Sequence, residues 1–169
     1  MIAYLTTWNS PIGPLHLIAD DEALICLAFD ANLDACRKRL GLSELTEQEN
    51  PVIKEAKEQL QEYFAGRRRD FSVPIKARGT AFQKKAWEAL QKIAYGQTVS
   101  YQAQARELGQ SGAIRATGSA NGRNPIAIIV PCHRVVRSDG AIGGYAGGIE
   151  VKEKLLALES RGAEQLALP

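Results

Sequence analysis

The thirteen residues from Asn124 to Val136 constrain this chain more than any other stretch. Five apolar residues run directly into a proline, a cysteine, a histidine and an arginine: Ile126–Val130, then Pro131, Cys132, His133 and Arg134. An apolar run of this length predicts a buried strand or a buried extended segment, and it is too short to cross a membrane. Because proline fixes its own φ and favours an extended residue before it, we expect the cysteine at an abrupt end of that segment, on a stiff backbone.

The thiol of Cys132 has two interpretations. Cysteine is among the most frequently buried residue types, so a lone cysteine is often structural. A nucleophilic thiol would need help, because a free cysteine titrates near 8.5, and the nearby candidates are His133, Arg134 and Glu159. Adjacent residues on an extended segment point to opposite sides, so a direct Cys132–His133 pair would need a turn or a bridging water. The residues alone leave alkyl and acyl chemistry open.

Composition places the chain among ordinary globular proteins. It has 169 residues, of which 45% are hydrophobic and 24% charged, enough for one domain or two small ones. The first eight residues lack the basic-then-apolar order of a signal peptide. Three irregularly spaced cysteines argue against a disulfide framework. We therefore expect a soluble cytoplasmic protein.

Charge is distributed unevenly along the chain. Residues 1–78 carry a net charge of −2, whereas residues 79–169 carry +4. Between Ser100 and Ser138 there are five arginines and one acidic residue, Glu107. Such asymmetry is typical of a second half that binds a polyanion, although charge clusters are often just solvated surface.

The first half predicts a small antiparallel sheet with helices. Residues 3–29 hold three β-prone runs separated by short turns, which favours a three-stranded meander. Helical patterns follow over residues 33–40 and 51–65, the second with Asn50 as its cap and Pro51 in its first turn. Residues 67–78 have no clear periodicity. We expect an N-terminal α/β domain with its linker over residues 1–78.

The second half predicts a mostly helical domain over residues 79–169, so the fold class is α+β. A capping box over residues 80–83 opens a helix that runs to about residue 93. Short helices from 101 to 108 and from about 113 to 121, joined by the Gly-containing turn at 109–112, form a helix-turn-helix pattern. The second of these is rich in Ala, Gly and Ser and bears Arg115. A glycine-rich loop over residues 138–148 and a helix from about 150 to 160 complete the domain.

Several separated motifs resemble one known family. Pro131–Val135 closely matches the active-site signature of the O6-alkylguanine-DNA alkyltransferases, also called methylated-DNA–protein-cysteine methyltransferases. Other segments are similar to family elements and stand in the family's order: Phe82-Gln83 with Trp87, Val99–Tyr101, Ala113–Gly118, Asn124-Pro125 and Gly143–Gly148. The resemblance covers nearly all of the second half, whereas the first half matches the family's α/β domain in general pattern.

The resemblance implies a suicide repair reaction. Cys132 would accept the alkyl group from O6 of a damaged guanine and keep it as a thioether. His133 would act as the base through a water molecule and would be oriented by Glu159, which removes the adjacency problem. Tyr101 would donate a proton or hydrogen bond to the departing guanine.

The resemblance also implies how DNA is bound. Atom O6 lies inside the duplex, so the damaged nucleotide must be flipped out, here through the minor groove. Arg115 would enter the base stack in its place, and Asn124 would hold the turn between the recognition helix and the active-site segment. The helix would contact DNA through Ala113, Ala116, Gly118, Ser119, Ala120 and Arg123. Val135, Tyr145 and Ala146 would line the guanine pocket.

The implied partner is double-stranded DNA containing O6-alkylguanine, with no membrane partner, and we expect a monomer without a cofactor. Some family members hold a structural zinc through Cys and His in the N-terminal domain. Cys26, Cys36 and His16 do not reproduce that set, so we predict no metal site. At position 146 an alanine offers the lesion its backbone amide and no hydroxyl.

Two other functions fit the same residues. One is a non-catalytic module that binds the alkylguanine lesion and leaves it intact. Related non-enzymatic proteins carry tryptophan at the cysteine position, so Cys132 favours an enzyme. The other is a Cys-His hydrolase acting on small acyl substrates, which would turn over repeatedly.

Overall fold

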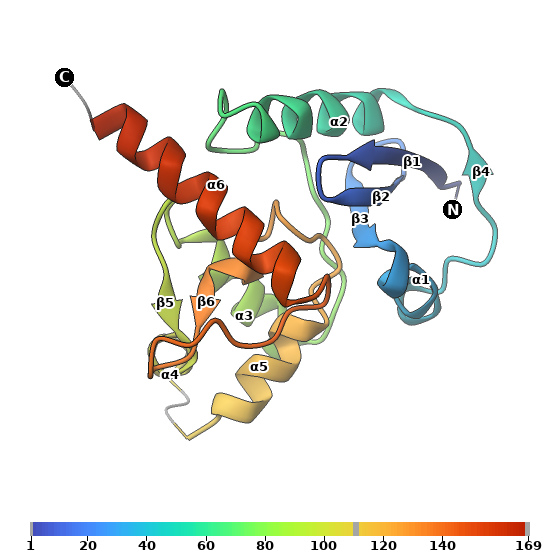
Figure 1. Cartoon of the computed structure of the whole chain (residues 1–169). Coiled ribbons are helices and arrows are strands. Elements are labelled where there is room, and N and C mark those ends of the chain that lie inside the picture. Colours follow the sequence, from blue (N-terminus) through green and yellow to red (C-terminus); the bar gives the residue numbers. More distant parts are fainter. Residues whose placement is uncertain (1, 110–111, 168–169) are drawn as a thin grey trace. The chain divides into compact units, whose positions relative to one another are not determined.

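The computed structural model describes residues 2–109 and 112–167, with side chains as far as residue 162. The chain divides into two compact units (Figure 1). Unit 1 comprises residues 1–78 and 125–127, and unit 2 comprises residues 79–124 and 128–169. The division after Arg78 lies where the sequence places the linker's end. The structure differs from the expected division at residues 125–127, which pack with unit 1.

Unit 1 is built on a four-stranded sheet of order β3-β2-β1-β4. Strands β1 (Tyr4–Ser10), β2 (Gly13–Ala19) and β3 (Leu24–Phe29) form an antiparallel meander, as the sequence predicted. The fourth strand, β4 (Thr46–Glu47), is short and runs parallel to the start of β1. The sequence did not predict it, because both of its residues are exposed and polar.

Helices cover both faces of this sheet (Figure 1). A short 3₁₀ helix, η1 (Asp30–Asn32), leads into α1 (Leu33–Leu40), which packs on the face bearing Ile18 and Cys26. Helix α2 (Pro51–Phe64) lies on the other face, where the rings of Trp8 and Phe64 are 6.0 Å apart. Both helices therefore bury apolar side chains that alternate along the strands.

The predicted cap of α2 is confirmed. The side chain of Asn50 accepts a hydrogen bond from the Ile53 amide at 2.9 Å, and Pro51 occupies the first helical position. Gly66, with a φ of 77°, ends the segment in a left-handed conformation that glycine adopts without strain. The linker then returns to the sheet, where Leu24 exchanges backbone hydrogen bonds with Pro74 and Lys76.

Unit 2 is mostly helical. Its helices are α3 (Ala81–Gln91), α4 (Tyr101–Glu107), α5 (Ile114–Gly122) and α6 (Ile149–Ala167), and its strands are β5 (Val99–Ser100) and β6 (Val135–Val136). The capping box at Thr80 and Gln83 is confirmed, as is the cap of α4 by Ser100. The final helix is longer than expected. The expected turn between α4 and α5 includes residues 110 and 111, which lie outside the described part of the chain.

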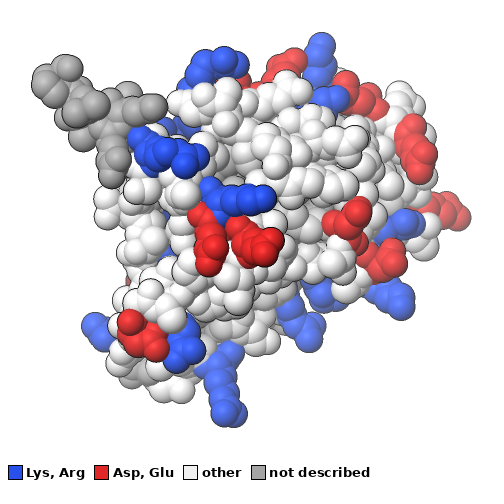
Figure 2. Space-filling view, viewed as in Figure 1, with Lys and Arg blue, Asp and Glu red and all other residues white. Residues whose placement is uncertain are grey.

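Polar contacts fix α5 against its neighbours. The indole of Trp87 on α3 donates to the carbonyl of Ala120 at 2.9 Å. The buried amides of Gln104 on α4 and Asn121 on α5 exchange two hydrogen bonds, at 2.7 and 2.9 Å. These contacts fix α5 against α3 and α4. Lys and Arg side chains project at the end of unit 2 that carries α4 and α5 (Figure 2).

The central apolar run is buried, as predicted, but it forms a turn and not the strand or extended segment that we expected. Ile126 forms an isolated bridge to Leu27 of β3, and Ile128 then turns the chain with a φ of 71°. A positive φ is strained for a β-branched residue, so surrounding contacts must hold it. The run is buried as a turn whose two ends are packed. The spacing of apolar residues in the sequence cannot distinguish such a turn from a strand.

Two features are absent from the described residues 2–109 and 112–167. There is no helix long and apolar enough to cross a membrane in that part of the chain. The same residues contain no cluster of three or more His, Cys, Asp or Glu side chains placed to hold a metal ion.

Candidate active site

Cys132 opens a short 3₁₀ helix, η2 (Cys132–Arg134), and its side chain borders a cavity of about 360 Å³. The other lining residues come from α4, α5 and the glycine-rich loop: Tyr101, Gly118, Asn121, Gly122, Gly144, Tyr145 and Ala146. The 3₁₀ turn replaces the extended geometry that we expected at Cys132 and His133. The structure thus brings Cys132, Tyr101 and two of the predicted pocket residues, Tyr145 and Ala146, together. The third predicted pocket residue, Val135, is fully buried and is not among the residues that line the cavity.

Asn124 fixes the approach to the thiol. Its side-chain amide donates to the carbonyl of Val130 at 2.7 Å and to Sγ of Cys132 at 3.3 Å. One side chain that follows α5 therefore contacts both the end of the apolar run and the nucleophilic sulfur itself. This arrangement agrees with the hinge role that the resemblance implies.

The surroundings of Cys132 act on the pKa of its thiol in both directions. Burial raises the pKa of Cys132 above its ordinary value, while the Asn124 hydrogen bond and the charge of Lys152 oppose that rise. Lys152 lies on α6, has no exposed surface, and donates from Nζ to the carbonyls of Val135 at 2.6 Å and Gly144 at 3.2 Å. Cys132 therefore rests as a protonated thiol, with the Lys152 ammonium group held nearby.

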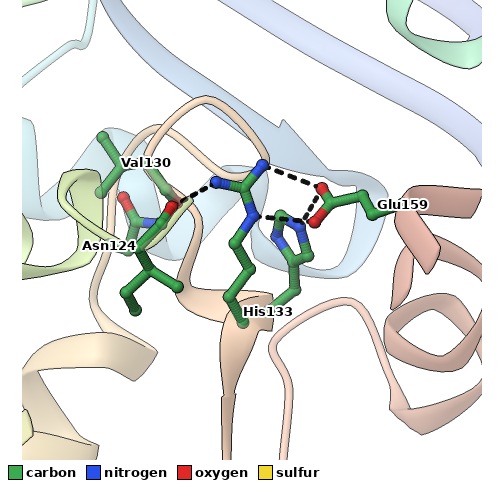
Figure 3. A network of polar contacts seen from close by, with 6 residues as sticks. Asn124, Val130, His133 and Glu159 are labelled. Carbon is green, nitrogen blue, oxygen red and sulfur yellow. Dashed lines mark hydrogen bonds and ion pairs between the residues drawn. The ribbon is translucent and has the colours of Figure 1, made fainter. Parts of the chain in front are cut away.

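His133 and Glu159 form a buried pair behind the cavity. Nε2 of His133 lies 2.7 Å from one carboxylate oxygen of Glu159, and the two side chains are 0% and 1% exposed (Figure 3). The guanidinium of Arg134 donates from Nε at 2.8 Å and from a terminal nitrogen at 3.1 Å to the same carboxylate, and also to the carbonyl of Ile93. Glu159 is thus held by two partners on η2.

These contacts determine protonation. Burial alone would raise the pKa of Glu159, but the hydrogen bonds and charges of His133 and Arg134 lower it to about 2. Burial lowers the pKa of His133, assisted by the charges of Arg134 and Lys152 and opposed by Glu159. The carboxylate therefore accepts from Nε2–H of a neutral imidazole, which leaves Nδ1 as the proton acceptor. Nδ1 is buried and makes no hydrogen bond within the described part of the chain.

Tyr101 and the glycine-rich loop close the other side of the cavity. The Tyr101 hydroxyl lies 3.5 Å from the carbonyl of Gly144, and burial and the Cys132 thiolate raise the pKa of this phenol. At Gly143, with a φ of 80°, an added Cβ would lie 3.1 Å from the Tyr101 ring. Glycine is therefore required there on two grounds. The ring of Tyr145 packs edge-on to His133, with centroids 6.5 Å apart.

Most of the predicted DNA-binding residues lie on the open face of α5. Arg115, Ala116, Ser119 and Arg123 are exposed and Ala113 is half-buried. Gly118 lines the cavity instead of standing on the outer surface. Ala120 must be removed from the predicted contact surface, because it is 4% exposed and its carbonyl accepts a hydrogen bond from Trp87 on α3.

Three features of the site were missed in the sequence. Lys152 was not singled out, although it stands seven residues before Glu159 and so on the same helical face. Arg134 was considered as a partner for the thiol, but the structure pairs it with Glu159. The Gln104–Asn121 pair has no sequence signal that we can identify, because buried amides of this kind look like ordinary helix surface.

Comparison with known proteins agrees with this geometry. Residues 3–77 match the family described as 6-O-methylguanine DNA methyltransferase, ribonuclease-like domain, and residues 81–161 match that described as 6-O-methylguanine DNA methyltransferase, DNA binding domain. A methylated-DNA–protein-cysteine methyltransferase of Methanosarcina acetivorans is 43% identical over 92% of this chain and 97% of its own length. The chain belongs to the 6-O-methylguanine DNA methyltransferase family.

Other methyltransferases support this membership. The constitutive methylated-DNA–protein-cysteine methyltransferase of Bacillus subtilis is 44% identical over 92% of this chain and 94% of its own length. Among solved structures, OGT of Mycobacterium tuberculosis in complex with DNA has a TM-score of 0.84 and 42% identity, covering 94% of each chain. The α+β fold, with a mixed N-terminal domain and a helical DNA-binding domain, is thus the fold of this methyltransferase family.

Proposed function

We propose that this methyltransferase transfers an alkyl group, typically methyl, from O6 of guanine in DNA to Sγ of its own Cys132. The observation that carries the proposal is a thiol that borders a cavity and is backed by a buried His133–Glu159 pair. Family membership and 43–46% identity to curated methylated-DNA–protein-cysteine methyltransferases support the reaction class. We assign the DNA-binding and transfer activity to residues 79–169, and a supporting role to residues 1–78.

Thiol activation follows from the charges around Cys132. A bridging water would carry the thiol proton to Nδ1 of His133, and the imidazolium that forms would be stabilised by the Glu159 carboxylate. Glu159 can do this because its contacts with His133 and Arg134 lower its pKa and keep it ionised in a buried site. Lys152 would stabilise the thiolate at the moment that it forms.

The transfer itself is a displacement at carbon. The Cys132 thiolate donates an electron pair to the alkyl carbon, a carbon–sulfur bond forms, and the carbon–oxygen bond to O6 breaks. The electron pair that leaves moves into the guanine ring, where a proton or hydrogen bond from Tyr101 makes the leaving group less basic. The backbone of Tyr145 and Ala146 would hold the base in the cavity. Water does not readily hydrolyse the resulting thioether, so each molecule would act once.

The exposed face of α5 would place the lesion. Its small side chains allow close approach to the minor groove, and Arg115 would fill the stack vacated by the flipped nucleotide. Arg123 would contact a phosphate, which makes binding salt-dependent. We propose a monomer as the working form, because one chain contributes every residue of this site. A reactive thiol also requires a reducing compartment such as the cytoplasm.

Intact-mass spectrometry tests the proposal. Reduced protein is mixed with a duplex oligonucleotide that carries one O6-methylguanine, and both partners are weighed. We expect the protein to gain one methyl group at a stoichiometry that does not exceed one per molecule, while the oligonucleotide loses it. Salt-dependent binding without a mass change would instead indicate a lesion-binding module, and continued release of product from an activated ester would indicate a hydrolase.

A further inference from the structure

Two cysteines in unit 1 lie together and have no part in the transfer reaction. Cys26 on β3 and Cys36 on α1 are free thiols whose Sγ atoms are 3.0 Å apart. They are 0% and 3% exposed and belong to the apolar layer between the sheet and α1. A disulfide joins sulfur atoms about 2.05 Å apart, so a small closing movement separates this pair from a covalent bond.

The surroundings give the two sulfur atoms different characters. The hydrogen bond from Cys26 lowers the pKa of Cys36, and the positive charge of Arg39 on the same helix acts in the same direction, while burial opposes both. The pKa of Cys26 is raised by that hydrogen bond, by burial and by the charge on Cys36. Cys36 is thus the sulfur that carries the negative charge when the pair loses a proton, and Cys26 remains a thiol beside it.

We propose that Cys26 and Cys36 are a redox-active pair that hydroperoxides oxidise to a reversible intramolecular disulfide. The Cys36 thiolate attacks the terminal peroxide oxygen, forms a sulfenic acid and releases an alcohol or water. Cys26 then attacks the Cys36 sulfur, which forms the sulfur–sulfur bond and expels the sulfenic oxygen as water. In total, two thiols lose two electrons and two protons, and the peroxide is reduced. An external dithiol reverses the reaction.

The cross-link would stabilise unit 1. It would join β3 to α1 across the turn that contains η1, and the closed loop would restrict the unfolded chain. The pair lies outside the residues that line the active-site cavity, so oxidation at this place would leave the Cys132 site intact. Burial also predicts selectivity: a small hydroperoxide would reach the pair, whereas a bulky aromatic disulfide reagent would not.

Peptide mapping tests the proposal. Full-length protein with Cys132→Ser, so that no reactive active-site thiol competes, is treated with one equivalent of hydrogen peroxide, unfolded, alkylated and digested with trypsin. Arg37 is the first tryptic site, so both cysteines fall in the peptide of residues 1–37. We expect this peptide without alkyl label and lighter by two hydrogen atoms, and we expect dithiothreitol to restore two labelled thiols.

Two variants complete the test. In Cys26→Ala and Cys36→Ala, each made in the Cys132→Ser background, peroxide should leave no intramolecular cross-link. In the parent, peroxide should raise the midpoint of thermal unfolding, and neither variant should show that rise. Two labelled thiols after peroxide treatment would overturn the proposal. Accumulation of a sulfinic acid on Cys36 with Cys26 still free would also overturn it, because it would show that the neighbouring thiol does not resolve the sulfenic acid.

Discussion

The carboxylate of Glu159 lies 2.7 Å from Nε2 of His133 and also accepts a hydrogen bond from the guanidinium of Arg134. The three side chains form a buried charge system in which one acid serves two neighbours from η2. The contacts keep Glu159 ionised, while burial lowers the pKa of His133 and keeps the imidazole neutral although Glu159 favours its charged form. A neutral imidazole whose Nε2 is already engaged can accept a proton only at Nδ1, and this is the basis of the proposed thiol activation.

Glu159→Gln should slow transfer and destabilise unit 2. Loss of the carboxylate removes the group that stabilises the imidazolium, so we expect the single-turnover rate to fall about 100-fold. It also leaves Arg134 buried without its counter-charge, which should cost about 3 kcal/mol of unfolding free energy in urea titrations. Glu153→Gln, an exposed residue on the same helix, is the matched control and should change neither quantity. A wild-type rate in Glu159→Gln would contradict the assigned role.

Stability should depend on pH through the same carboxylate. The folded pKa of Glu159 is about 2, below its ordinary value of 4.5, so its contribution is complete above that ordinary range and disappears as the pH falls towards 2. A shift of this size corresponds to about 3 kcal/mol. The wild type should therefore lose stability on acidification more steeply than Glu159→Gln does. Parallel urea-unfolding curves of the two proteins from neutral to acid pH would contradict this.

The transfer rate should show the protonation of His133. Because burial lowers the pKa of His133 below 6.5, the neutral base persists into mildly acid solution. We expect the single-turnover rate to hold until the pH is below the ordinary titration range of histidine, and then to fall. A rate that already declines at neutral pH would mean that the imidazole is not held neutral as proposed.

Lys152→Met should separate the effect of charge from that of packing. Methionine fills much of the same space without the cation, so we expect the pKa of Cys132 to rise and the transfer rate to fall, because less of the thiol ionises at a given pH. The thiol's reaction with iodoacetamide, measured against pH, reports the shift directly. Lys154→Met, at an exposed position of α6, is the control and should behave as wild type.

Arg115→Ala should impair lesion capture without harming the chemistry. If Arg115 replaces the flipped nucleotide in the stack, its loss slows transfer from duplex DNA and leaves transfer from the free base O6-benzylguanine unchanged. Arg123→Ala should instead weaken binding uniformly and reduce the salt slope by about one unit. Equal losses on duplex and free base in Arg115→Ala would show that the variant damaged the cavity.

Local signals in the sequence predicted much of the fold. Helix caps such as Asn50 and Thr80 depend on a few neighbouring residues, so they can be predicted before the fold is known. The strand predicted at residues 126–130 failed because burial of an apolar run does not specify a hydrogen-bonding partner. Strand β4 could not be predicted for the opposite reason. Its backbone pairing with the edge of β1 forms it, and its sequence has no apolar pattern.

The site was predicted unevenly for a related reason. Cys132, His133, Asn124 and Glu159 belong to motifs that a family resemblance can carry to their positions. The roles of the other site residues depend on contacts between segments distant in the sequence. Lys152 is a fully buried cation, and Arg134 donates to Glu159 on α6. Ala120 showed the limit of composition, because a small residue on a small-residue helix can face either the groove or the core.

Tandem mass spectrometry that locates the transferred methyl group shows whether Cys132 is the acceptor. Protein that has reacted with one equivalent of O6-methylguanine duplex is digested, and the methyl group is located among Cys26, Cys36 and Cys132. We predict methylation of Cys132 alone, with the other two cysteines unmodified and the guanine restored. A methyl group on another residue, or repaired DNA with an unmodified Cys132, would contradict the account.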